Sequence, residues 1–136
     1  TLTSHYMVHK NDISVPLSKI PEAISKISSL ISTLYPSATS EIFGHVGDGN
    51  LHVNICVPKG TAEEQKKFFI SAAQHDHNIF SIIKELGGSI SAEHGVGLLK
   101  KPYLSYSRSI HEIDIMRNIK KVFDPKSILN PGKIFS

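Results

Sequence analysis

The chain has 136 residues, of which 40% are hydrophobic, and a formal charge of +3 with histidine counted as neutral. This is the size of one ordinary domain with one packed core, and the mild charge, without any run of five basic residues, argues against nucleic-acid binding and suits a small anionic substrate. No apolar run approaches the roughly 20 residues of a membrane span. The single cysteine, Cys56, excludes an intramolecular disulfide, and with no signal peptide we do not expect secretion. Because the chain starts at Thr1 without methionine, we expect a fragment of a longer protein.

The first third of the chain predicts a strand and a helix. Residues 3–9 are typical of a strand, and the segment K-N-D-I-S-V-P after it predicts a turn closed by Pro16. Ser18 is the expected N-cap of a helix over about 19–34, which Pro36 ends because proline cannot continue the hydrogen-bond ladder. The apolar residues of this helix fall at three- and four-residue intervals: Ile20, Ala23, Ile24, Ile27, Leu30, Ile31 and Leu34.

The middle of the chain predicts a hairpin and a long helix. Residues 41–46 and 51–57 are typical of two strands, and the second has one apolar face and one face with His52, Asn54 and Cys56. We expect Cys56 to be a small buried thiol. The sequence T-A-E-E at 61–64 is a capping box for a helix over about 62–86, and the following residue, Gly87, stands where a left-handed C-cap belongs.

The last third predicts a short strand over 89–97 that runs into a glycine-rich loop, then a helical turn over 98–104. Ser109 and Glu112 form a second capping box, at the start of a helix over about 110–122. Its inward residues should be Ile110, Ile113, Met116, Ile119 and Val122, and the tail should tuck in Ile128 and Leu129. The order β-α-β-β-α-β-α predicts an α+β sandwich, with helices on one face of a mostly antiparallel sheet.

The densest chemistry lies in G-H-V-G-D-G-N-L-H, residues 44–52. Asp-Gly at 48–49 indicates a two-residue turn, which would place His45 directly opposite His52. Directly opposed Cβ atoms lie about 4.5–5.5 Å apart, so the two imidazoles could share a metal ion, with Asn54 on the same face. The hairpin alone supports a metal site and a plain hairpin with incidental histidines about equally.

A third ligand is available in S-A-E-H-G-V-G, residues 91–97. Adjacent residues of an extended segment point to opposite sides, so we expect Glu93 on the metal and His94 facing a reacting atom. Two histidines and one carboxylate with an open position is a catalytic arrangement. A salt bridge at the end of a strand explains this pair equally well. The remaining histidines are expected at the surface: His5, His9, His75, His77 and His111.

Three separated motifs resemble the C-terminal part of the FAD-linked oxidases with a vanillyl-alcohol-oxidase type flavin domain: GHVGDGNLHVNI, SAEHGVGLLKK and FDPKSILNPGKIF. Within that family the sequence is most similar to the D-lactate and D-2-hydroxyglutarate dehydrogenases. The resemblance implies that residues 1–136 are a single substrate- and metal-binding domain with a ferredoxin-like α+β sandwich. It also implies that the N-terminal FAD-binding domain is absent from this chain.

The resemblance assigns metal and catalytic roles to four residues. His45, His52 and Glu93 would bind a divalent metal, commonly zinc. His94 would lie near the flavin ring and act as the catalytic base.

The resemblance assigns substrate and cofactor roles to three others. Lys10 would bind the substrate carboxylate, Asn54 would contact the substrate, and Asn130 would lie near the flavin. The implied reaction oxidises a D-2-hydroxy acid to the 2-oxo acid: His94 removes the hydroxyl proton and hydride passes from C2 to the flavin. The implied partners are the hydroxy acid and the FAD domain of the same protein, in the mitochondrion or the cytoplasm. The isolated fragment should be inactive, and a homodimer stays open.

Two other functions remain open on the residues alone. One is a protein-interaction module of the actin-interacting type, a label that some proteins of this family carry. The other is a free-standing zinc hydrolase with His45, His52 and Glu93 on the metal, which would leave the N-P-G-K-I-F tail unexplained.

Overall fold

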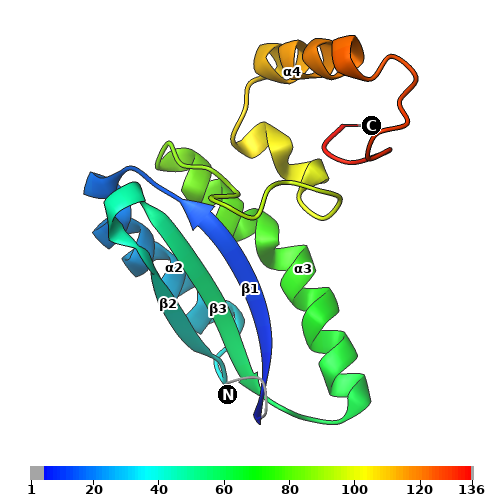
Figure 1. Cartoon of the computed structure of the whole chain (residues 1–136). Helices are drawn as coiled ribbons and strands as arrows, with labels where there is room; N and C mark the ends of the chain where they lie inside the picture. Colours follow the sequence, from blue (N-terminus) through cyan, green and yellow to red (C-terminus); the bar gives the residue numbers. More distant parts are fainter. Residues whose placement is uncertain (1–4, 136) are drawn as a thin grey trace.

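Three antiparallel strands form the sheet in the part of the chain that this computed structural model describes, residues 5–135. Strands β1 (Tyr6–Ser14), β2 (Thr39–His45) and β3 (Asn50–Pro58) lie in the order β1-β3-β2 (Figure 1). The turn predicted from residue 10 is therefore wrong: β1 continues to Ser14, because its backbone pairs with β3 along the whole length of that strand. The strand predicted over 89–97 is also wrong: a single isolated β-bridge, between Ser14 and Ser89, joins this segment to the sheet in the described part of the chain.

The helices largely match the sequence expectation. Their bounds are η1 (Leu17–Lys19), α2 (Ile20–Leu34), η2 (Val46–Asp48), α3 (Ala62–Glu85), η3 (Lys101–Tyr106) and α4 (Ile110–Phe123), where η marks a 3₁₀ turn. Both capping boxes are confirmed, at Thr61 and Ser109. The N-cap predicted at Ser18 is wrong, because the short turn η1 takes up residues 17–19 and α2 begins after it, with proline in its first turn.

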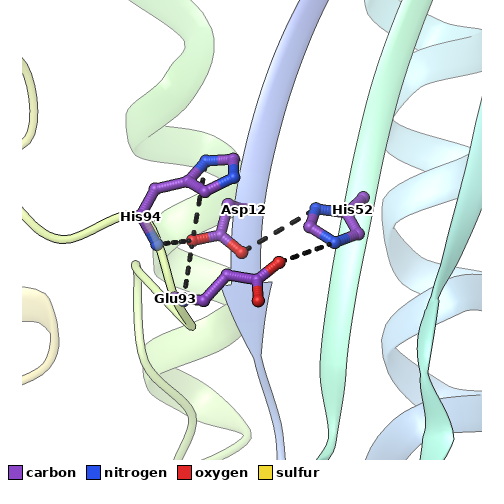
Figure 2. A group of neighbouring side chains, drawn as sticks. All are labelled: Asp12, His52, Glu93 and His94. Carbon is purple, nitrogen blue, oxygen red and sulfur yellow. Dashed lines mark hydrogen bonds and ion pairs between the residues drawn. The ribbon is translucent and has the colours of Figure 1, made fainter.

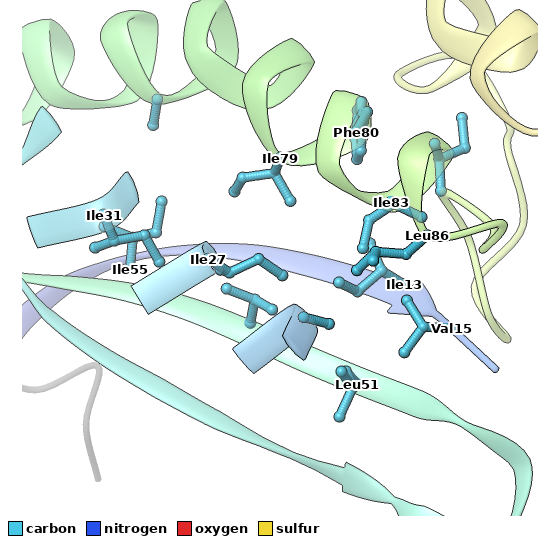
Figure 3. Packing of buried hydrophobic residues seen from close by; sticks show 14 of the residues in the cluster. Ile13, Val15, Ile27, Ile31, Leu51, Ile55, Ile79, Phe80, Ile83 and Leu86 are labelled. Carbon is cyan, nitrogen blue, oxygen red and sulfur yellow. The ribbon is translucent and has the colours of Figure 1, made fainter. Parts of the chain in front are cut away.

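Helices α2 and α3 cover one face of the sheet and enclose the core (Figures 1 and 3). The core residues include Ile13, Val53 and Ile55 of the sheet, Ile27 and Ile31 of α2, and Ile79, Phe80 and Ile83 of α3. The α+β architecture with helices on one face of an antiparallel sheet is confirmed.

Two histidines that were expected at the surface, His9 and His75, are instead partly buried and hydrogen-bonded. His9 Nε2 lies 2.7 Å from Oδ1 of Asp76 on α3, and Asn11 Nδ2 donates to the same oxygen at 2.9 Å. His75 Nδ1 lies 2.8 Å from the hydroxyl of Tyr35. Partly buried polar groups between packed elements need such partners, because water does not reach them freely.

Helix α4 and the tail are much less buried than their sequence predicts. Ile113 is buried, but the exposed fraction is 54% at Ile119 and 77% at Val122. Other residues predicted to turn inward are also exposed: Ile110, Ile128 and Leu129. An amphipathic stripe requires a covering surface, and the described residues do not provide one for this helix.

None of the helices within residues 5–135 is long and apolar enough to cross a membrane.

Candidate metal and substrate site

The hairpin between β2 and β3 turns through four residues rather than two. His45 pairs with Asn50, and His52 pairs with Phe43, so the predicted direct opposition of His45 and His52 is wrong. A shift by two residues keeps both side chains on one face of the sheet. The two histidines are consequently diagonal neighbours, with ring centroids 6.0 Å apart.

Gly49 explains the longer turn, because it closes the hairpin against the end of β1. Its φ is 76°, and a Cβ at this position would lie 2.1 Å from the carbonyl oxygen of Val15. Val15 N–H donates to the Gly49 carbonyl at 3.1 Å. Asp48 stabilises the turn through its Oδ1, which accepts from Asn50 N–H at 3.0 Å. A contact with Val15, the residue that follows β1, and not the Asp-Gly pair alone, thus determines the register.

The sheet face opposite the helices carries the polar residues of the site. Register places Lys10 beside Asn54, and Asp12 beside His52. A hollow of about 230 Å³ opens on this face and is lined by Lys10, Asn11, Phe43, His52, Asn54 and His94. The structure therefore brings together both residues expected to contact substrate and the expected base.

Four groups next to this hollow could hold a metal ion: Asp12, His52, Glu93 and His94 (Figure 2). Each offers one ligand atom, and these atoms all lie within 4.8 Å of one another. His52 Nε2 lies 3.2 Å from Glu93 Oε1, and His52 Nδ1 lies 3.8 Å from Asp12 Oδ1. The imidazole of His52 thus stands between two carboxylates.

Asp12 is a residue of this cluster that sequence reasoning missed. Its exposed fraction is 3%, and its Oδ2 accepts backbone N–H groups of Ala92 at 3.1 Å, Glu93 at 3.0 Å and His94 at 2.9 Å. Its other oxygen, Oδ1, is buried and has no hydrogen-bond partner among the described residues. The segment K-N-D-I-S does contain the signal, because as a strand it places Asp12 on the same face as Lys10.

The electrostatics of Asp12 favour its ionised form. Burial acts to raise its pKa, but hydrogen bonds from the backbone of His94 and Glu93, with the charges of His94 and Lys100, hold the pKa below its ordinary value. A buried carboxylate kept ionised next to an imidazole suits a site that attracts a cation.

Lys100 fastens the same loop to β1. Its Nζ donates to the carbonyl oxygens of Asp12 and Ile90, both at 2.7 Å. Burial lowers the pKa of Lys100, and the charges of Asp12 and Asp76 oppose that effect. The loop that carries Glu93 is therefore held by two charged groups, the buried Asp12 and the partly buried Lys100.

Two of the predicted site residues belong neither to the group of four nor to the lining of the hollow. His45 is exposed and contacts the ring of His52 edge-on. Asn130 is exposed on the tail, where its Oδ1 accepts from Lys133 Nζ at 2.9 Å. A larger hollow of about 350 Å³ lies between α4 and the tail, but none of the four clustered groups lines it. We therefore place the candidate site at the sheet face.

The fold and this site define an α+β domain that presents imidazole, carboxylate, lysine and amide groups on one open sheet face. Residues 1–134 match the family described as FAD linked oxidases, C-terminal domain, and the chain belongs to that family.

Three relatives illustrate the range of similar proteins. A D-2-hydroxyglutarate dehydrogenase of Stutzerimonas stutzeri is 47% identical over 133 residues, which is 98% of this chain and 28% of that protein. A mitochondrial D-2-hydroxyglutarate dehydrogenase of Danio rerio is 38% identical over 97% of this chain and 23% of its own length. A D-lactate dehydrogenase of Anaerostipes hadrus is 40% identical over 90% of this chain and 25% of its own length. The chain thus spans about a quarter of the length of these relatives.

Proposed function

We propose that this chain is the substrate- and metal-binding part of a flavin-dependent dehydrogenase that oxidises a D-2-hydroxy acid, D-2-hydroxyglutarate or D-lactate, to the 2-oxo acid. The observation that carries the proposal is the cluster of His52, Glu93, His94 and Asp12 beside the hollow that Lys10 and Asn54 line. Family membership and the names of the relatives support it. The flavin would be held mainly by the rest of a longer protein, so the isolated chain should be inactive.

The residues fit a divalent metal ion such as zinc. Two ligands at about 2.0–2.1 Å from one tetrahedral ion stand roughly 3.3 Å apart. The separation of 3.2 Å between His52 Nε2 and Glu93 Oε1 agrees with this value. His45, the diagonal neighbour of His52, would supply the third ligand from the hairpin. When bound, the metal supplies a Lewis acid that lowers the pKa of the substrate hydroxyl.

The chain's own residues bind the substrate and move its proton. Lys10 is a point charge that attracts and orients the substrate carboxylate, and Asn54 offers an amide to its oxygens. His94, in its neutral form, would take the hydroxyl proton as general base. When bound, the flavin supplies the acceptor for the hydride that leaves C2, the carbon that carries this hydroxyl group.

The metal content of the purified protein tests this proposal. We expect His52→Ala to lose most of the bound metal, because one ligand is removed. His111→Ala is the matched control, since His111 is an exposed histidine at the start of α4, and it should keep the metal of the wild type. Equal metal in both variants would contradict the site.

Steady-state kinetics of the intact protein test the substrate side. We expect Lys10→Met to raise KM for the hydroxy acid by one to two orders of magnitude, because a hydrogen bond to a charged group contributes about 1.5–3 kcal/mol. A KM that does not change would remove Lys10 from the substrate site.

A further inference from the structure

The two oxygens of Asp12 face different partners. Oδ2 faces the loop of residues 91–94, and Oδ1 faces the ring of His52 (Figure 2). Asp12 therefore contacts both segments that carry the proposed metal ligands, although it comes from a third strand.

The loop side is a complete hydrogen-bonding arrangement. Three consecutive N–H groups, at residues 92, 93 and 94, converge on Oδ2, and Ser91 Oγ donates to it at 3.3 Å. Successive amides that converge on one oxygen form a nest for an anion, and here the anion is a side chain of the same chain. This contact fixes the backbone of Glu93 and hence the place from which its carboxylate reaches His52.

The His52 side is an incomplete arrangement. Oδ1 is buried and has no hydrogen bond within residues 5–135, and His52 Nδ1 lies 3.8 Å from it, somewhat beyond hydrogen-bond length. The other ring nitrogen, Nε2, points to Glu93 at 3.2 Å. The two ring nitrogens of an imidazole point in diverging directions, so a metal ion that Nε2 and Glu93 would hold leaves Nδ1 facing Asp12 Oδ1. Asp12 consequently faces the nitrogen that must carry the proton when Nε2 binds a metal.

We propose that Asp12 is a positioning residue, which holds Glu93 through the loop amides and orients His52 by accepting a hydrogen bond from its Nδ1–H. This inference rests on the proposed metal-binding role of His52 and Glu93. Ion binding at Nε2 fixes the proton on Nδ1, and the short remaining gap to Oδ1 then closes to a hydrogen bond. A buried acceptor that lacks a partner would gain one at that step.

The test is Asp12→Asn in the full chain, with zinc as the probe. The amide oxygen can still accept from the three loop N–H groups, but its NH₂ then faces the Nδ1–H of His52 and repels it. We expect zinc affinity, measured by chelator competition, to fall about 10- to 100-fold, as for other partners of metal-bound histidine. In the zinc-loaded wild type, NMR should show a His52 Nδ1–H that exchanges slowly with solvent, and the variant should lose that signal.

Asp48→Asn is the matched control. It removes the same charge from the neighbouring turn, while the amide oxygen still accepts from Asn50 N–H. We expect its zinc affinity and its His52 signal to match the wild type, and we expect amide exchange at residues 92–94 to stay slow in both variants.

The possible failures are distinguishable. Wild-type protein that binds no zinc would overturn the proposed function and this inference with it. Wild-type protein that binds zinc through Nδ1 of His52, or a variant Asp12→Asn that keeps both the affinity and the Nδ1–H signal, would overturn this inference alone. If the Asp12→Asn variant fails to fold, the NMR spectrum of the zinc-loaded wild type still decides the question. It shows whether His52 binds zinc through Nε2 and keeps its proton on Nδ1.

Discussion

At the scale of single residues, burial determines what a reactive group can do. Cys56 shares its sheet face with His52 and Asn54, yet its exposed fraction is 1%. Burial, with the nearby charge of Glu41, raises the pKa of its thiol above the ordinary value. Since the thiolate is the reactive form, burial and the raised pKa both disfavour reaction of this side chain.

We therefore expect Cys56 to react slowly with a thiol reagent such as dithionitrobenzoate in the folded protein. An opening free energy of about 3 kcal/mol corresponds to a reaction on the order of 100-fold slower than in urea. Absorbance at the reagent's product band measures it, and Cys56→Ser is the blank. Equal rates in buffer and in urea would show that the thiol is accessible.

Asp124 is, like Asp12, a carboxylate whose ionised form has a structural role. Its ion pair with Lys120 lowers its pKa, hydrogen bonds from the N–H groups of Leu129 and Ile128 act in the same direction, and burial opposes them. Because the pKa is lower in the folded state, the stabilisation is present above the unfolded value of about 3.9 and is lost as the pH falls through the folded value.

We expect the start of the tail to loosen below about pH 3.9 while α3 keeps its structure. Hydrogen exchange at the amides of Ile128 and Leu129, compared with that of Ala72 in the core, measures the effect. Asp124→Asn should give the loosened tail at neutral pH as well. Unchanged protection at both amides down to pH 3 would contradict the assigned role.

Single residues also show what sequence can predict. Capping boxes at Thr61 and Ser109 are local, and both are present as predicted. Asp12 is different, because its role comes from amides about eighty positions away, which no local pattern reveals.

At the scale of elements, helix bounds are close to the prediction and strand register is not. A helix is specified by contacts between residues three and four positions apart, which a sequence displays directly. Hairpin register depends on where the turn closes, and here Gly49 closes against Val15 of another segment. The prediction that His45 and His52 lie on one face of the sheet is nevertheless correct, because a two-residue shift in register does not change the face.

The hairpin offers a matched pair of glycine substitutions. Gly49→Ala places a side chain at a φ of 76° and against the Val15 carbonyl, whereas a Cβ on Gly47 meets no atom of the described residues within 4 Å. We expect Gly49→Ala to lower the free energy of unfolding by about 1–3 kcal/mol, and Gly47→Ala to change it by less than about 0.5 kcal/mol. Urea denaturation of both variants measures this, and equal effects would show that the turn does not depend on Gly49.

At the scale of the whole molecule, the described chain has a well-packed part and a thinly covered part. The sheet with α2 and α3 shares one core, while α4 and the tail leave most of their apolar side chains exposed. Amphipathic periodicity shows that a helix face is to be covered, but it does not say by which surface. The prediction of the inward face of α4 failed for this reason.

Hydrogen exchange across the whole chain should separate these two parts. We expect amides of β3 and α3 to exchange at rates set by global unfolding, and amides of α4 to exchange at least about 100-fold faster, through local opening. Mass spectrometry of peptides from 50–58 and 110–123 compares them. If the two peptides show the same protection, α4 is part of the same cooperative unit.

The contacts of Asp12 have a consequence for the order in which the molecule is built. Its three loop amides lie 80, 81 and 82 positions further along the chain. Contacts of such separation close slowly, because the entropy of a long loop is lost before the contact is gained. During synthesis β1 leaves the ribosome long before the loop does. The carboxylate of Asp12 therefore stays hydrated until α3 has packed on the sheet and the loop has followed. The candidate site is thus expected to form late in folding, after β1 and the segment that follows α3 have come together.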